Sequence, residues 1–126
     1  MTILLDTNAL LWFLFNDGRL GRRAHSIITG SAALALSDAS RWEISVKISA
    51  QKLAPIPQLL GVLRELDLRR LGIDDRYLAR LETLPLHHRD PFDRMLVAQA
   101  LSDDLTVLTA DPVFARYGVR VVDARE

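Results

Sequence analysis

Short apolar runs alternate with longer amphipathic segments along the whole chain, and this alternation is the feature that most constrains its fold. The first run, Met1 to Leu5, stops abruptly at Asp6, and a later run, Thr106 to Thr109, stops just before Asp111. Short apolar runs bounded by turn residues are typical of buried strands. Strands that alternate with helices form a parallel sheet covered by helices on both faces.

The predicted sheet has about five strands. They are expected at residues 1–5, 32–36, 106–109 and 119–122, with a weaker candidate within 66–73. Helices are expected at residues 10–15, 21–30, 40–51, 59–65, 74–84, 92–101 and 113–117. In the helix that starts at Ser40, the candidate buried positions are Trp42, Ile44, Val46 and Ile48. A chain of 126 residues has the usual size of one domain, so we expect residues 1–126 to form a single α/β domain with three layers, α/β/α.

The composition excludes several classes of protein. The 16 basic and 16 acidic residues balance, which excludes a polybasic tail but not a local basic patch. Cysteine is absent, so disulfides, thiolate metal sites and a cysteine nucleophile are excluded. No apolar run approaches the roughly 18 residues of a membrane span, and no basic leader precedes an apolar stretch. We therefore expect a cytoplasmic protein with no membrane partner.

Four carboxylates lie where a parallel sheet would gather them. Asp6 and Asp111 each follow a predicted strand, and ligands bind beyond the carboxyl ends of parallel strands. Glu43 and Asp93 lie near the starts of predicted helices, which begin at the same edge of the sheet in βα units. The sequence therefore predicts that the four acids converge.

Each of these acids also has a local structural interpretation. Asp6 and Asp111 fit helix N-caps, and Ser40 with Glu43 fits a capping box. Asp90 to Asp93 fits a cap, a proline at the first helical position and an acid in the first turn. Together, however, carboxylates within roughly 4–6 Å repel one another and raise each other's pKa. A bound cation relieves that repulsion, and an all-oxygen cluster favours Mg²⁺ or Mn²⁺ over zinc.

Other chemistry-bearing residues have simpler interpretations. His87 and His88 are adjacent and lack a third nitrogen or sulfur ligand at a recognisable spacing, so we interpret them as loop residues rather than zinc ligands. Trp12 and Trp42 fit core or interface positions better than nucleotide stacking. The arginine doublets fit a solvated surface, with phosphate contact as the second interpretation. These doublets are Arg22, Arg23, Arg69 and Arg70.

Four blocks of sequence, in order and spread over the whole chain, resemble the PIN-domain family. Within that family they are most similar to the VapC-type toxins of bacterial toxin–antitoxin pairs. The blocks are Leu4 to Trp12, Ser40 to Lys47, His87 to Ala100 and Leu108 to Phe114, and the likeness continues into Tyr117 to Asp123. The resemblance implies a PIN-like fold, in which a parallel sheet of about five strands lies between helices.

The resemblance also implies a metal-dependent endoribonuclease, the toxin of a type II toxin–antitoxin pair. Asp6 and Asp93 would bind Mg²⁺ or Mn²⁺ directly, and Glu43 and Asp111 would complete the cluster. Glu43 could take the proton from the attacking water. The implied supporting residues are Asn8, Asp90 and Thr109. The implied partners are an RNA substrate, a cognate antitoxin whose C-terminal segment blocks the cleft, and a second copy of the chain in a homodimer.

Three alternatives stay open on the sequence. A phospho-receiver domain also clusters acids around Mg²⁺, but it normally has a lysine after a late strand, and no lysine follows Lys52. A haloacid-dehalogenase-like phosphatase would carry a second aspartate where Asn8 stands. The third alternative is a non-catalytic PIN fold that only binds a partner, and the intact set of acids favours an enzyme over it.

Overall fold

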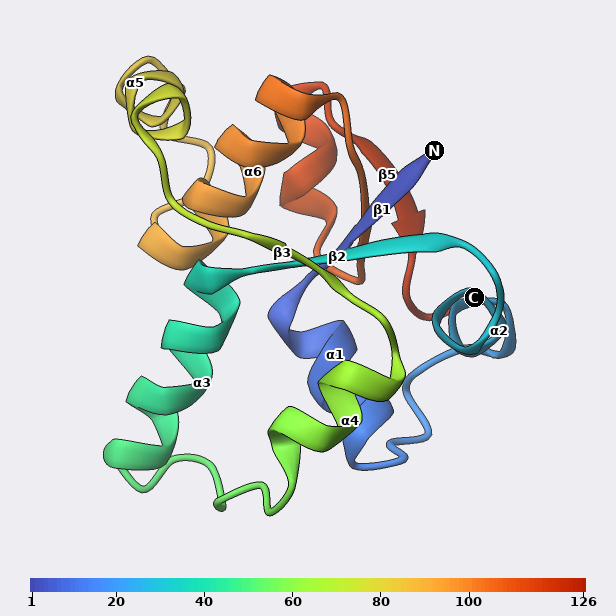
Figure 1. Cartoon of the computed structure of the whole chain (residues 1–126). Coiled ribbons are helices and arrows are strands. Elements are labelled where there is room, and N and C mark those ends of the chain that lie inside the picture. Colours follow the sequence, from blue (N-terminus) through green and yellow to red (C-terminus); the bar gives the residue numbers. More distant parts are fainter.

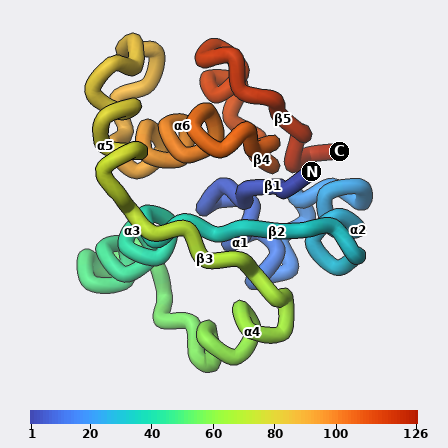
Figure 2. Tube along the Cα trace, turned by 45° about the horizontal axis from the view of Figure 1, so that its top comes forward, coloured from blue at the N-terminus to red at the C-terminus, as the bar shows by residue number.

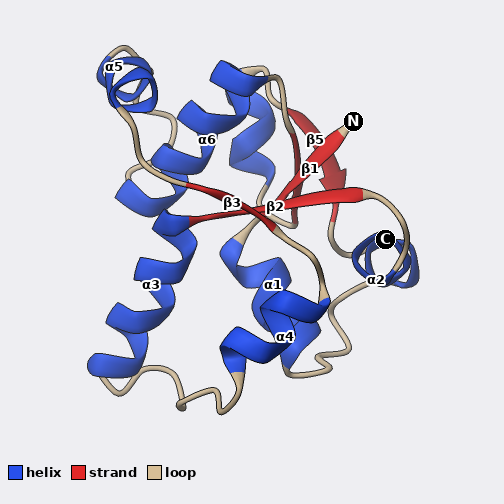
Figure 3. Cartoon of the chain, viewed as in Figure 1, coloured by secondary structure: helices blue, strands red, loops and turns tan.

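The computed structural model describes residues 1–126 and has the predicted three-layer α/β/α arrangement (Figures 1 and 3). The central sheet has five strands in the order β3-β2-β1-β4-β5, and every pair is parallel. The strands are β1 (Thr2–Leu5), β2 (Ala33–Ser37), β3 (Arg69–Leu71), β4 (Thr106–Thr109) and β5 (Arg120–Asp123). The helices are α1 (Thr7–Leu14), α2 (Arg22–Thr29), α3 (Asp38–Ser49), α4 (Leu59–Glu65), α5 (Asp75–Glu82), α6 (Pro91–Asp103) and the 3₁₀ helix η1 (Pro112–Tyr117). The weakest predicted strand is therefore confirmed as β3, at one edge of the sheet.

Different helices cover the two faces of the sheet. The helices α5 and α6 lie on one face, and α1, α2 and α4 lie on the other (Figure 2). The helix α3 continues from the end of β2 at the side of the sheet and contacts both α1 and α6. This placement puts α3 between the two helical layers, so its residues can reach groups on either side.

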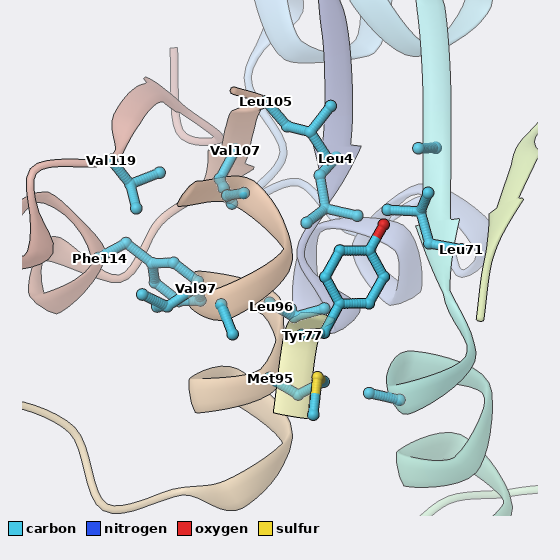
Figure 4. Close-up of a cluster of buried hydrophobic side chains, with 14 of the residues drawn as sticks. Leu4, Leu71, Tyr77, Met95, Leu96, Val97, Leu105, Val107, Phe114 and Val119 are labelled. Carbon is cyan, nitrogen blue, oxygen red and sulfur yellow. The ribbon is translucent and has the colours of Figure 1, made fainter. Parts of the chain in front are cut away.

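The central strand β1 explains why the apolar runs predict a sheet covered on both faces. Leu4 packs into the core under α6, together with Val107 and Phe114 (Figure 4). Its neighbours Ile3 and Leu5 point the other way, into the core formed with α1 and α2. Full burial of each such side chain stabilises the fold by roughly 1.5–3 kcal/mol. A strand buried on both faces has no polar alternation, which is the pattern in the sequence.

Three strands end side by side at the edge of the sheet that carries the predicted acids. Asp6 directly follows β1, Ser37 ends β2 and Thr109 ends β4. The backbone N–H of Asp6 donates to the carbonyl of Leu108 at 3.0 Å, which ties the end of β1 to the end of β4. Asp111 follows β4 by two residues, at the same edge. The parallel topology thus brings Asp6, near the beginning of the chain, and Asp111, near its end, to the same edge of the sheet.

The start of α3 differs from the prediction. Ser37 is the N-cap of this helix, and its hydroxyl accepts a backbone N–H of the first turn at 3.0 Å. The predicted capping box of Ser40 and Glu43 is therefore wrong, since both residues lie inside the helix. Ser40 instead accepts a hydrogen bond from Thr7 Oγ1 at 2.8 Å. Serine is a preferred N-cap residue, and Ser37, three residues before the predicted cap, takes that position instead.

The burial of α3 also differs from the prediction. Trp42 and Val46 are 61% and 42% exposed, one turn apart on the same face of the helix. Ile44 is buried, and Ile48 packs partly buried against the same core. The ring of Trp42 makes an edge-to-face contact with Phe92 at the start of α6, with 5.1 Å between the ring centroids. Because α3 lies at the side of the sheet, only a stripe of it meets the core.

Candidate active site

Asp6 is buried directly after β1 and is 4% exposed. It occupies the N-cap position of α1, but its carboxylate does not cap the helix as predicted. Its Oδ2 atom instead accepts a hydrogen bond from Thr109 Oγ1 at 2.8 Å. Burial raises the pKa of Asp6 to about 6; the Thr109 hydrogen bond opposes this shift, and the charges of Glu43 and Asp111 add to it. The Asp6 carboxylate therefore belongs to a group of acids rather than to a helix end.

Glu43 lies in the second turn of α3 and is 6% exposed. Its Oε2 atom lies 2.9 Å from Nζ of Lys47, one turn further along the helix. The i, i+4 spacing is the sequence signal from which this ion pair can be predicted. The other oxygen, Oε1, is buried and has no hydrogen-bond partner. Leaving a buried carboxylate oxygen unpaired costs free energy, so this atom is available to a ligand.

Asp93 lies in the first turn of α6, as predicted. Burial raises its pKa to about 8, and the negative charges of other acids add to the shift. In decreasing order of effect, these acids are Asp6, Asp90, Glu43 and Asp111. Carboxylates perturb one another in this way only when they lie near one another. The structure therefore brings the four predicted acids together, although they come from four separate elements.

Asp111 is held at both of its oxygens. Its Oδ1 atom accepts the backbone N–H of Val113 at 2.9 Å, which makes it the predicted N-cap of η1. Its Oδ2 atom lies 3.0 Å from Nε2 of His88, and Oδ2 of Asp93 also lies 3.0 Å from that nitrogen. The potential metal-ligating atoms of His88, Asp93 and Asp111 all lie within 4.8 Å of one another.

His88 is the residue of this cluster that the sequence does not single out. It lies in the predicted loop between α5 and α6, and nothing in the spacing separates it from His87. The ring of His87 packs instead against Tyr117, with 4.9 Å between the ring centroids. The backbone N–H of His88 donates to the Tyr117 hydroxyl at 2.8 Å, which ties the loop to η1. This placement depends on contacts between distant segments, which a local pattern does not encode.

The predicted supporting residues lie in different environments. Thr109 donates to Asp6 and also accepts the backbone N–H of Asp111 at 3.0 Å. Asp90 is the N-cap of α6, and its Oδ1 atom accepts the N–H groups of Phe92 at 2.8 Å and Asp93 at 3.0 Å. Asn8 is exposed in the first turn of α1. Thr109 therefore contacts both Asp6 and Asp111, and Asp90 holds the backbone of Asp93. Asn8 makes no such contact and lies exposed in α1, two residues after Asp6.

The sequence matches the PIN domain over residues 3–120, from β1 to the first residue of β5. The chain belongs to the PIN domain family. PIN domains are usually metal-dependent nucleases. Membership of this family excludes the phospho-receiver and phosphatase alternatives, because those proteins belong to other families.

Three solved structures illustrate the likeness of this PIN domain to known folds. VapBC2 from Rickettsia felis, bound to a DNA fragment from its promoter, has a TM-score of 0.74 at 14% identity, with 97% of this chain and 98% of that chain covered. FitAcB from Neisseria gonorrhoeae has a TM-score of 0.71 at 20% identity, with 97% of each chain covered. A toxin–antitoxin complex from Klebsiella pneumoniae has a TM-score of 0.66 at 24% identity, with 98% of each chain covered. A comparison with curated protein sequences gave no match.

The donor set of this PIN domain fits a hard divalent cation. Its ligand candidates are carboxylate oxygens, and one of them, Oε1 of Glu43, is buried without a partner. Mutual repulsion contributes to the raised pKa values of Asp6 and Asp93, and a cation would relieve it. Zinc sites are usually built from histidine nitrogen and cysteine sulfur, and the cluster holds a single histidine. Oxygen-rich sites suit Mg²⁺ and Mn²⁺ instead.

Proposed function

We propose that this PIN domain is a metal-dependent endoribonuclease and the toxin of a type II toxin–antitoxin pair. The observation that carries the proposal is the convergence of four carboxylates, with the pKa of Asp93 raised to about 8. A buried group of mutually repelling carboxylates costs stability and is typical of sites that bind a cation or move a proton. Membership of the PIN family supports the nuclease activity, and the toxin–antitoxin complexes among similar structures support the toxin role.

We infer that Asp6 and Asp93 hold Mg²⁺ or Mn²⁺ directly, and that Glu43 and Asp111 complete the surroundings of the ion. The bound ion would neutralise the charge of the phosphodiester and lower the pKa of the attacking water. The unpaired Oε1 of Glu43 and the raised pKa values of Asp6 and Asp93 support this assignment.

The residues around the ion would have separate tasks. Glu43 would accept the proton of the attacking water at Oε1, because Lys47 holds Oε2 at 2.9 Å. Thr109 would keep Asp6 in one orientation through the 2.8 Å hydrogen bond to Oδ2. Because water attacks rather than the 2′-hydroxyl, the products would carry a 5′-phosphate and a 3′-hydroxyl. The chain has no net positive charge with which to attract RNA. Contacts with flanking phosphates would therefore come from individual exposed arginines, such as Arg89 next to Asp90.

The proposal includes two protein partners. An antitoxin segment that inserts a basic side chain among the carboxylates would block the site and neutralise the same charges as the cation. A homodimer interface would cover exposed apolar side chains, and this chain exposes Phe15, Trp42 and Val46. None of the helices has the length and apolar character needed to cross a membrane. With cellular RNA as the substrate, the toxin would act in the cytoplasm.

Cleavage of purified transfer, ribosomal and messenger RNA tests this function. The wild-type protein should cleave RNA with Mg²⁺ or Mn²⁺ and stop when EDTA is added. Asp6→Asn and Asp93→Asn should each lower the cleavage rate by at least roughly a hundredfold while the fold is retained, because each removes a ligand charge. Asp75→Asn, on the exposed first turn of α5, is the matched control and should cleave like the wild type.

Two results of this assay would contradict the proposal. Full activity of both Asp6→Asn and Asp93→Asn would refute the assignment of the site. A folded wild-type protein that binds RNA without cleaving it, with either ion, would indicate a non-catalytic PIN domain.

A further inference from the structure

We propose that His88 is a positioning residue that donates a hydrogen bond from Nε2 to Asp111 while the same nitrogen lies against Asp93, and that it is not a ligand of the metal. The catalytic consequence of this role depends on the proposed nuclease function, whereas the hydrogen bonds themselves do not. The proposal is argued from the contacts of both ring nitrogens.

The contact of Nδ1 determines which ring nitrogen carries the proton. The backbone N–H of Asp90 donates to Nδ1 of His88 at 3.1 Å. A neutral imidazole has one N–H donor and one acceptor nitrogen, so an accepting Nδ1 places the proton on Nε2. That Nε2–H group lies 3.0 Å from Oδ2 of Asp93 and 3.0 Å from Oδ2 of Asp111. The proton therefore lies in the hydrogen bond to Asp111, at the start of η1, and the Asp93 carboxylate from α6 lies against the same nitrogen.

The surroundings hold the ring in this position. The backbone N–H of His88 donates to the Tyr117 hydroxyl at 2.8 Å, and the ring lies edge-on to buried Phe114, with 6.3 Å between the ring centroids. Arg94 donates to the carbonyl of Pro85 at 3.0 Å, which fixes the preceding part of the loop to α6. The His88 side chain is only 18% exposed. Both ends of the imidazole are therefore defined by the protein.

A role as metal ligand would disrupt this arrangement. To offer a lone pair at Nε2, the neutral ring would have to carry its proton on Nδ1. That Nδ1–H group would then face the N–H of Asp90 at 3.1 Å, donor against donor. Residues that orient the ligands of a metal site typically change metal affinity or activity by roughly 10–100-fold when they are removed. His88 fits that role, because it donates to one proposed ligand, Asp111, and contacts a second, Asp93.

Two substitutions separate the two ring nitrogens. In His88→Gln, the side-chain amide N–H reaches approximately the position of Nε2, so the donor to Asp111 beside Asp93 is kept. In His88→Asn, the side chain reaches only the position of Nδ1, so it can keep the contact with the Asp90 N–H but not the hydrogen bond to Asp111. We expect His88→Asn to lower Mn²⁺ affinity and kcat by roughly 10–100-fold with little change in KM for RNA. His88→Gln should restore both to within a few-fold of the wild type. Equal losses in the two variants, or no loss in His88→Asn, would overturn the proposal.

Spectroscopy tests the same proposal without relying on RNA cleavage. Nitrogen NMR of the metal-free wild-type protein should show that the neutral His88 ring carries its proton on Nε2. Pulsed EPR of the Mn²⁺-loaded protein should show no directly bound ¹⁴N. A proton on Nδ1, or a coordinated nitrogen that disappears in His88→Gln, would identify His88 as a ligand and overturn the proposal. These readouts stand even if the wild-type protein cleaves no RNA, so failure of the proposed function is distinguishable.

Discussion

At the scale of single residues, two buried threonines of β4 differ in whether their hydroxyl groups form a hydrogen bond. Thr109 donates to the Asp6 carboxylate, whereas Oγ1 of Thr106 is buried without a partner. Thr109→Val should therefore lower the free energy of unfolding by roughly 1.5–3 kcal/mol, the usual value for a hydrogen bond to a charged group. Thr106→Val keeps the shape and removes an unpaired hydroxyl, so it should be neutral or stabilising. Urea unfolding of both variants measures the difference, and equal losses of stability would contradict it.

The raised pKa values of the acids predict how stability depends on pH. The pKa values of Asp6 and Asp93 are about 6 and about 8 in the folded protein, above the ordinary value of 3.8. Between pH 4 and 8 the metal-free folded state therefore binds more protons than the unfolded state. The stability that these protons contribute is fully present below pH 4 and is lost as pH rises through 6 and 8.

Denaturant unfolding in EDTA measures this dependence. The metal-free wild-type protein should be less stable at about pH 8.5 than at about pH 5.5. Asp93→Asn should show a weaker dependence, because it removes the group with the larger shift. A free energy of unfolding that increases over this interval in the wild type would show that the pKa values of these carboxyl groups are not raised in the folded protein.

At the scale of the elements, the start of α3 gives a test of helix capping. Ser37 caps this helix through its hydroxyl, so Ser37→Ala should cost about 1 kcal/mol of unfolding free energy. Ser49, the exposed last residue of the same helix, provides the matched control, and Ser49→Ala should change stability by less than about 0.5 kcal/mol. Thermal or urea unfolding measures both. A loss in Ser49→Ala as large as that in Ser37→Ala would contradict the assigned cap.

The elements also show what local patterns can predict. The strands β1 and β4 are predictable because burial on both faces leaves a continuous apolar run. The start of α6 is predictable because Asp90 and Pro91 are both strong start signals, and the structure shows Asp90 as the cap. The first residue of α3 is not predictable in this way, because serine is a preferred N-cap residue and stands at both position 37 and position 40. The apolar spacing predicts Trp42 to be buried, because that spacing does not reveal that α3 lies at the side of the sheet.

At the scale of the whole molecule, the two tryptophans report on different environments. Trp12 is 9% exposed, with the guanidinium groups of Arg19 and Arg125 over its ring, whereas Trp42 is 61% exposed. At low protein concentration, acrylamide should therefore quench the fluorescence of Trp12→Phe several-fold more efficiently than that of Trp42→Phe. Equal quenching would contradict this difference in exposure. If the proposed homodimer covers Trp42, quenching of Trp12→Phe should fall as the protein concentration rises.

The site is a property of the whole molecule more than of its motifs. The convergence of Asp6 and Asp111 follows from parallel strands ending at one edge, so the sequence predicts it through the topology. Glu43 reaches the same place from the second turn of α3, and the capping box that was its alternative interpretation does not form. His88 enters through a loop tied to Tyr117, and no local signal predicts that contact. The carboxylates and Thr109 are predictable from the sequence, but His88 is not.

Binding of Mn²⁺, followed by EPR on the purified protein, tests most directly whether the four carboxylates form a metal site. The wild-type protein should bind Mn²⁺, and Mg²⁺ should compete for the same site. Asp93→Asn should lose at least roughly tenfold in affinity while Asp75→Asn keeps the wild-type value. A correctly folded wild-type protein that leaves all of the Mn²⁺ free in solution would contradict the account.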